Sequence, residues 1–211
     1  MSIGLGVDTG GTFTDAAIVD LDSKKILSKA KSPTTYQDLS IGILGAIDGA
    51  LSSCSIPPAD IDIVGLSTTL ATNSILEGKG GEVGLLGIGW TPRDDWELGC
   101  KKSTFITGGY DSWGMKSTNM NESELNKALE YICEGVDAVA VSGKFSVANP
   151  MQETRVKRMI MSKYGLPVVL GHEMSAELGI YERTVTAVLN AQLMTIISSF
   201  LNSMETSLNS R

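Results

Sequence analysis

A turn rich in glycine and threonine carries the strongest chemical signal in the sequence. It runs from Asp8 to Asp15, reads Asp-Thr-Gly-Gly-Thr-Phe-Thr-Asp, and lies between two predicted strands. Glycine permits positive φ and close approach of a ligand to the backbone, and successive N–H groups in such a turn form a concave anion site. Threonine hydroxyls add hydrogen-bond donors. We therefore expect a phosphate-binding turn, with the candidate residues Asp8, Thr9, Gly10, Gly11, Thr12 and Thr14.

The carboxylate of Asp8 gives this turn a candidate metal ligand. At the end of a buried strand it is suited to hold Mg²⁺, directly or through water, beside a polyphosphate. The alternative is an ordinary hairpin that Asp8 caps. Other phosphate motifs are absent, since Gly78-Lys79 and Gly143-Lys144 are not followed by Ser or Thr, and Gly4-Leu5-Gly6 lacks the next glycine of a dinucleotide fingerprint. The expected site is thus a hairpin and not a helix N-terminus.

A second candidate site follows the predicted strand at 61–66. Threonine hydroxyls and an asparagine amide lie there, just before or at the start of a predicted short helix. The N-terminus of a helix favours the binding of a phosphate or a substrate carboxylate. The alternative is that Thr68 or Thr69 only caps the helix. The candidate residues for substrate binding are Thr68, Thr69, Thr72 and Asn73.

A third candidate site follows the short predicted strand at 168–170. Ligands gather at the strand ends of open α/β sheets. His172, the only histidine, is a candidate general base or hydrogen-bond donor, oriented by its neighbour Glu173. The alternative is a histidine that is hydrogen-bonded for structural reasons alone.

The hydrophobic pattern predicts the elements that must position these sites. Strands are expected at 3–7, 12–20, 25–30, 61–66, 82–88, 138–141 and 168–170. Helices are expected at 39–51, 72–77, behind the capping residue Asn121 to Ile132, between Asn149 and Gly165, and from 181 to about 208. The segment from Trp90 to Lys116 reads as irregular. Three antiparallel strands followed by helix–strand units predict an α/β domain of three layers, with one mixed sheet and helices on both faces.

The final helix has an unusual composition. No charged residue occurs from Thr184 to Met204, although a solvated helix face normally carries Lys or Glu. Asn190, Gln192 and several hydroxyls argue against a membrane span. We expect contacts on more than one side, with another lobe or a second copy of the chain, and the alternative is simple packing on its own sheet.

Composition excludes several classes of function. The 211 residues carry 17 Lys and Arg against 24 Asp and Glu, a net charge of −7, which argues against nucleic-acid binding. The single histidine excludes His-rich zinc sites, and the widely spaced cysteines indicate neither a disulfide framework nor a CxxC site. The first residues hold no signal-peptide pattern, so we expect a cytoplasmic protein.

Four ordered blocks carry a family resemblance. The turn resembles the first phosphate motif of the actin, sugar-kinase and heat-shock-chaperone ATPase superfamily, and the run from Gly6 to Asp15 is similar to the start of the hydantoinase A/oxoprolinase family. The later blocks that resemble this family are Ser67–Gly78, Phe145–Pro150 with Glu153, and His172–Ser175 followed by Tyr181-Glu182-Arg183-Thr184 and Asn190-Ala191. Ser67 departs from the family's glycine, and Gly143-Lys144 replaces a more apolar lead-in.

The resemblance implies a ribonuclease H-like ATPase lobe that uses ATP and Mg²⁺ to open cyclic amides such as 5-oxoproline or hydantoins. Related members carboxylate ketones. In both reactions phosphoryl transfer would activate a carbonyl or enol oxygen, with catalysis by positioning and charge stabilisation. Gly10, Gly11 and Thr12 would hold the β- and γ-phosphates, and Asp8 would organise Mg²⁺.

The resemblance also implies a division of the chain and a missing partner. Residues 1–180 would form the N-terminal lobe, and 181–211 a helix leading towards a second lobe that completes the nucleotide site. We therefore expect little catalysis by this chain alone. The alternatives are a non-catalytic module that pairs with a separate C-terminal subunit or with itself through 184–204, and, less favoured, a lobe of a sugar or acid kinase.

Overall fold

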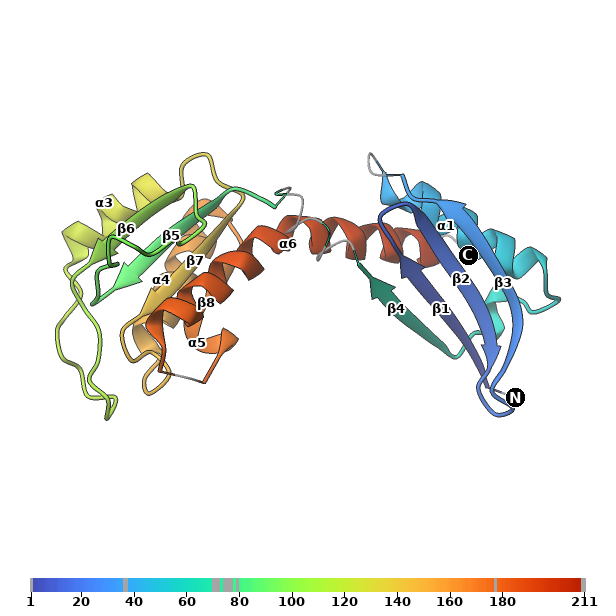
Figure 1. Ribbon diagram of the computed structural model, residues 1–211, viewed down its shortest axis with the longest axis horizontal. Helices are drawn as coiled ribbons and strands as arrows, with labels where there is room; N and C mark the ends of the chain where they lie inside the picture. Colours follow the sequence, from blue (N-terminus) through green and yellow to red (C-terminus); the bar gives the residue numbers. More distant parts are fainter. Residues whose placement is uncertain are drawn as a thin grey trace. The chain divides into compact units, whose positions relative to one another are not determined.

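The chain folds into two compact units. The computed structural model describes residues 2–35, 38–69, 73, 78, 80–176 and 178–209 (Figure 1). Unit 1 comprises Met1–Lys79 and Ile196–Arg211, and unit 2 comprises Gly80–Thr195. The last helix, α6 (Ile180–Asn209), contributes residues to both units, so its N-terminal part belongs to one core and its C-terminal part to the other.

Unit 1 is built on a four-stranded mixed sheet. Its elements are β1 (Ile3–Thr9), β2 (Phe13–Asp20), β3 (Lys25–Pro33), α1 (Leu39–Ser52), a 3₁₀ turn (Pro58–Asp60) and β4 (Ile63–Thr68). The strand order is β3-β2-β1-β4, in which the first three strands are antiparallel and β4 runs parallel to β1. The helix between β3 and β4 is long enough to make that parallel return.

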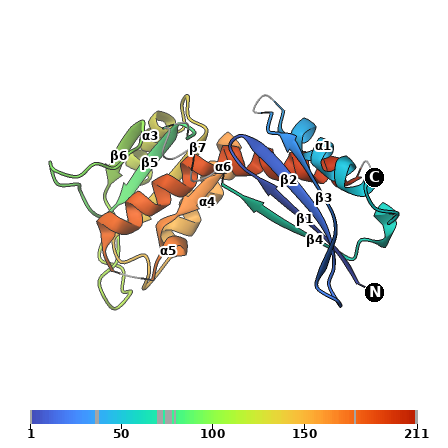
Figure 2. The same cartoon turned by 45° about the vertical axis from the view of Figure 1, so that its right-hand side comes forward.

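One face of the unit 1 sheet carries the hydrophobic core. Alternate residues of β1, among them Leu5 and Val7, are buried against Ile43 and Ile47 of α1. The C-terminal part of α6 adds Phe200 and Met204 to this core, and Figure 2 shows it beside α1. The opposite face of the sheet exposes the alternate residues of the same strands, and in the described ranges no helix covers it.

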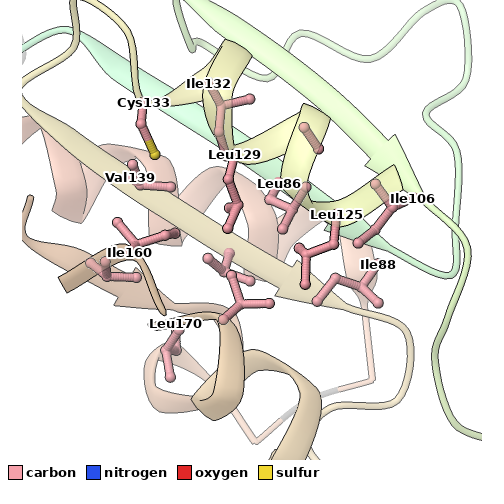
Figure 3. Close-up of a cluster of buried hydrophobic side chains, with 14 residues drawn as sticks. Leu86, Ile88, Ile106, Leu125, Leu129, Ile132, Cys133, Val139, Ile160 and Leu170 are labelled. Carbon is pink, nitrogen blue, oxygen red and sulfur yellow. The ribbon is translucent and has the colours of Figure 1, made fainter. Parts of the chain in front are cut away.

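Unit 2 is built on a parallel sheet of strand order β6-β5-β7-β8. Its elements are β5 (Val83–Ile88), β6 (Lys102–Ile106), α3 (Glu122–Ile132), β7 (Ala138–Gly143), α4 (Met151–Tyr164), β8 (Val168–Leu170), α5 (Gly171–Met174) and the first half of α6. Helices α3 and α4 pack on one face, where Leu125, Leu129 and Ile160 meet the strands (Figure 3). Helix α6 packs on the other face through Ala187, Val188 and Ala191.

The predicted α/β class with a mixed sheet is confirmed, but the strands form two sheets instead of one. Strand β5 pairs with β6 on one side and with β7 on the other, so neither of its edges remains for β4. Strand β6 lies inside the segment predicted to be irregular. The Asn121 cap is confirmed, because its side chain accepts the N–H groups of Ser123 and Glu124. The predicted helix at 72–77 lies outside the described residues, apart from Asn73.

The apolar stripe of α6 is used within the chain. Of the described helices, α6 alone is long and apolar enough, over Ile180–Asn202, to cross a membrane by length and hydropathy. Its residues 187, 188 and 191 are nevertheless buried in the core of unit 2, and Phe200 and Met204 are buried in that of unit 1. The expected contacts on more than one side are therefore supplied by both units.

Two strand glycines provide a matched test of the packing in unit 2. A Cβ at Gly84 of β5 would overlap the carbonyl oxygen of Ile132 in α3, whereas a Cβ at Gly65 of β4 would meet nothing within 4 Å. We expect Gly84→Ala to lower the free energy of unfolding by about 1–3 kcal/mol, and Gly65→Ala to change it by less than about 0.5 kcal/mol. Urea unfolding followed by circular dichroism measures both, and equal losses would contradict this packing.

Candidate functional site

The glycine turn joins β1 to β2 as a tight hairpin. The N–H of Gly10 donates to the carbonyl oxygen of Phe13 at 2.9 Å. A Cβ at Gly10 would lie 3.1 Å from that same oxygen, so a side chain there would crowd the turn. In the register of the two strands Thr9 lies opposite Thr14, and Asp8 lies opposite Asp15. The hairpin predicted from the sequence is thus present, with the N–H of Gly10 used to close it.

Thr34, which follows β3, braces the turn from one side. Its N–H donates to the carbonyl oxygen of Thr12, and its hydroxyl donates to that of Gly10, both at 2.9 Å. The same hydroxyl lies 3.1 Å from the hydroxyl of Thr14, which is fully buried. Thr34 fixes two carbonyls of the turn, a role that no local pattern around it indicated.

The predicted block at the end of β4 braces the turn from the other side. The hydroxyl of Thr68 and the N–H of Thr69 both donate to the carbonyl oxygen of Thr9, at 2.9 and 3.2 Å. The N–H of Asn73 donates to the carbonyl oxygen of Thr69 at 3.0 Å, as at the start of a helix. Thr72 lies outside the described residues. The structure therefore places Thr68 and Thr69, from the second candidate site, in contact with the glycine turn.

The three threonines of the turn differ in what they can reach. Thr9 and Thr14 are fully buried and lie on the core side of the sheet, whereas Thr12 is exposed. Thr12 is therefore the turn threonine whose hydroxyl faces solvent, and Thr14 contacts Thr34. The donor role expected for Thr9 and Thr14 stays a prediction.

Two carboxylates lie side by side on the open face of the unit 1 sheet. Asp8 and Asp15 are directly opposed and exposed, and Lys31 Nζ lies 3.2 Å from Asp15 Oδ1. Like charges so placed repel each other, which a bound cation relieves. A cavity of about 830 Å³ covers this part of the face; it is lined by Gly6, Val7, Asp8, Asp15, Ala16, Ala17, Lys29, Ala30, Lys31, Gly65, Leu66 and Ser67.

These donors fit Mg²⁺ held beside a polyphosphate. Mg²⁺ takes oxygen ligands, and proteins commonly supply one or two carboxylates while phosphates and water complete the shell. The described residues contain no group of three or more His, Cys, Asp or Glu that would form an all-protein cage. Asp15, which the sequence reading left without a role, follows from strand alternation, since it shares a face with Asp8.

His172 lies in unit 2, in the short helix α5 that follows β8. Its Nδ1 lies 2.5 Å from Oε2 of Glu153, and its backbone N–H donates to the same oxygen at 3.1 Å. Glu173 instead pairs with Lys157, whose Nζ lies 3.2 Å from both carboxylate oxygens. Adjacent residues of a helix do not face each other, so Glu173 does not orient His172 as expected from the sequence. Glu153 takes that position.

Glu153 belongs to a buried polar cluster at the carboxyl ends of β7 and β8. It is fully buried, and its Oε1 accepts the N–H of Gly143 at 2.6 Å. Arg183, 1% exposed, donates to the carbonyl oxygen of Gly143 at 3.0 Å. Burial lowers the pKa of Arg183, and the negative charge of Glu153 opposes that effect. Residues from two of the sequence blocks thus meet here, Glu153 from one block and His172 and Arg183 from the other.

The fold and the hairpin define an α/β lobe with a glycine-rich turn between its first two strands. Residues 4–164 match the family model described as the hydantoinase/oxoprolinase N-terminal region. The chain belongs to the hydantoinase/oxoprolinase family.

Characterised relatives agree with this family. The chain is 32% identical to the acetophenone carboxylase gamma subunit of Aromatoleum aromaticum, over 90% of this chain and 31% of that protein. It is 31% identical to the caprolactamase subunit alpha of Pseudomonas jessenii, over 95% of this chain and 32% of that protein. The chain therefore spans about a third of the length of the curated relatives it matches.

Solved structures share the fold. The ATP-dependent caprolactamase of Pseudomonas jessenii matches 98% of this chain with 33% of its own, at a TM-score of 0.74 and 27% identity. A nucleotide-free acetone carboxylase structure matches 97% of this chain with 34% of its own, at a TM-score of 0.76 and 20% identity. These matches confirm the expected fold class.

Proposed function

We propose that this chain is the phosphate-binding N-terminal lobe of an ATP-dependent enzyme that opens cyclic amides of the 5-oxoproline or hydantoin type. The observation that carries the proposal is the hairpin at Gly10 and Gly11, braced by Thr34 and β4, in a chain of this family. The relatives include an ATP-dependent caprolactamase, whose name denotes a cyclic amide, and ketone carboxylases. Both types of substrate have a carbonyl oxygen that phosphoryl transfer would activate.

The residues of the turn have distinct proposed roles. Gly10 and Gly11 let the β- and γ-phosphates approach the backbone of the turn without meeting a side chain, although the N–H of Gly10 itself closes the hairpin. The exposed hydroxyl of Thr12 donates to these phosphates. Asp8 holds Mg²⁺, with Asp15 opposite it; the ion, when bound, neutralises phosphate charge. Thr68 and Thr69 keep the turn in register with β4. With Thr72 and Asn73 they remain the proposed contacts to the substrate.

The whole activity belongs to a longer assembly in this proposal. A second lobe or subunit supplies the other half of the nucleotide site, and the enzyme works in the cytoplasm. A second candidate function is a non-catalytic module that pairs with a separate subunit. The names of two relatives, a gamma subunit and a subunit alpha, favour subunit pairing in either case.

The turn predicts weak binding of Mg²⁺-ATP that depends on Asp8. We expect calorimetric titration to give a dissociation constant in the millimolar range, and Asp8→Asn to weaken it about tenfold or more, since tenfold corresponds to about 1.4 kcal/mol. Asp60→Asn is the matched control, because this exposed aspartate lies before β4, at the other end of the sheet. Equal binding by Asp8→Asn, or none by the unaltered chain at millimolar nucleotide, would contradict the proposal.

A further inference from the structure

The polar cluster in unit 2 consists of fully buried side chains and one histidine that is partly exposed. Ser142, Glu153 and Thr184 are fully buried, while the His172 side chain remains 19% exposed. Burying polar groups costs free energy unless each finds a partner. The hydroxyls of Ser142 and Thr184 lie 2.7 Å apart, and Trp90 Nε1 donates to the carbonyl oxygen of Ser142 at 2.8 Å. The buried hydroxyls of Ser142 and Thr184 thus have a partner within the cluster.

The hydrogen bonds of Glu153 leave its Oε2 facing the imidazole of His172. Oε1 accepts the N–H of Gly143, and Oε2 accepts the N–H of His172. The guanidinium of Arg183 adds a positive charge nearby. A carboxylate that accepts at both oxygens and faces a cation is ionised, so it accepts from the imidazole as well. In the neutral imidazole Nδ1 then carries the ring proton, and Nε2 keeps its lone pair.

We propose that His172 is a general base at the carboxyl ends of β7 and β8, and that Glu153 is the residue that positions it. Nε2 takes a proton from an N–H or C–H group next to a carbonyl. The bond between that proton and the substrate breaks, a bond to Nε2 forms, and the electron pair left behind spreads onto the carbonyl oxygen. Ionised Glu153 balances the charge of the imidazolium until the proton returns to the product.

The assignment of an amide N–H as the proton donor rests on the proposed function, whereas the His172–Glu153 pair does not. Cyclic amides with a free N–H and enolisable ketones both carry such a proton. Removing it makes the carbonyl oxygen more electron-rich, which is the change that a later reaction at that oxygen requires.

The backbone around the His172–Glu153 pair has one strained residue and one position where glycine permits close packing. Phe145, in the turn after β7, has φ 51°, a left-handed value that is strained for a bulky side chain. A Cβ at Gly171 would lie 3.1 Å from Ser142 Oγ and 3.4 Å from Glu153 Oε1, so glycine lets the chain pass close to the carboxylate. The buried hydroxyl of Ser146 has no hydrogen-bond partner within the described ranges. Such strain is concentrated at functional sites.

The single histidine makes a direct test by nitrogen-15 NMR possible. In the unaltered chain we expect the Nδ1–H tautomer, with its proton shifted far downfield by the bond to Glu153. Glu153→Gln should remove the downfield resonance and shift the ring towards the Nε2–H tautomer. Glu173→Gln is the matched control, since Glu173 pairs with Lys157, and it should leave the signals unchanged. Dispersed amide spectra establish that each variant folds.

Chemical modification of Nε2 gives a second readout. We expect diethyl pyrocarbonate to modify His172 in the folded chain, about tenfold more slowly in Glu153→Gln and within about twofold of normal in Glu173→Gln, because the partner of one ring nitrogen sets the ring's orientation and basicity. His172→Gln supplies the baseline. An Nε2–H tautomer in the unaltered chain would overturn the proposal even if Glu153→Gln did not fold. An equal response of the two folded glutamate variants would overturn it as well. Neither measurement involves nucleotide, so failure of Mg²⁺-ATP binding is a separate outcome.

Discussion

Replacing Arg183 with methionine is expected to lower the free energy of unfolding of unit 2 by about 3–5 kcal/mol. The guanidinium is 1% exposed and donates to the carbonyl oxygen of Gly143 at 3.0 Å. Methionine fills much of the same volume, but it leaves the carboxylate of Glu153 buried without its neighbouring positive charge. The loss of unfolding free energy therefore comes from a buried charge that lacks a neighbouring opposite charge, and not from a cavity in the core.

Arg155→Met is the control that separates burial from the mere loss of an ion pair. Arg155 lies 2.7 Å from Glu122, but about half of each side chain is exposed, so the loss should be within about 0–1 kcal/mol. The tryptophans Trp90, Trp96 and Trp113 all lie in unit 2, so their fluorescence in urea reports its unfolding. Similar losses for the two variants would mean that Arg183 does not act through the buried carboxylate.

Local pattern predicted the elements of this chain well, because hydrophobic alternation and capping are encoded over a few residues. The hairpin at Gly10 and Gly11, the buried strand β5 and the cap at Asn121 all follow from such short signals. The pairing of β5 with β6 did not follow. Strand β6 is only five residues long, and its Phe105 packs edge-on against Trp90, a contact that local sequence does not encode.

The candidate sites were found as motifs, but their internal contacts were not. Glu153 is 19 residues before His172 and approaches it only because α4 and β8 pack together. Glu173 is the carboxylate nearest to His172 in the sequence, but adjacent side chains of a helix point apart. Thr34 is similarly 20 residues from Thr14, and its support of the turn depends on the pairing of β2 with β3. Local sequence therefore indicates which residues are chemically suited to a site, whereas tertiary packing determines which residues they contact.

Replacing Phe200 with alanine is expected to lower the free energy of unfolding of unit 1 by about 3–5 kcal/mol. Phe200 is 3% exposed and packs in one core with β1 and α1. Alanine would lose the transfer free energy of the ring and leave a cavity in a small core. Native-state hydrogen exchange of the amides in β1 and β2 measures the loss, and the tryptophan fluorescence of unit 2 should change much less.

Leu201→Ala on the same helix tests whether one face of α6 accounts for that loss. Leu201 is 50% exposed, so removing its side chain should cost less than about 0.5 kcal/mol. A cost equal to that of Phe200→Ala would contradict the one-sided packing. If that cost also grew with protein concentration, it would mean that a second copy covers the exposed face, which is the self-association that the uncharged sequence of this helix suggests. If Leu201→Ala lowers the unfolding free energy only slightly at every protein concentration, packing in the cores of the two units explains the apolar composition of α6.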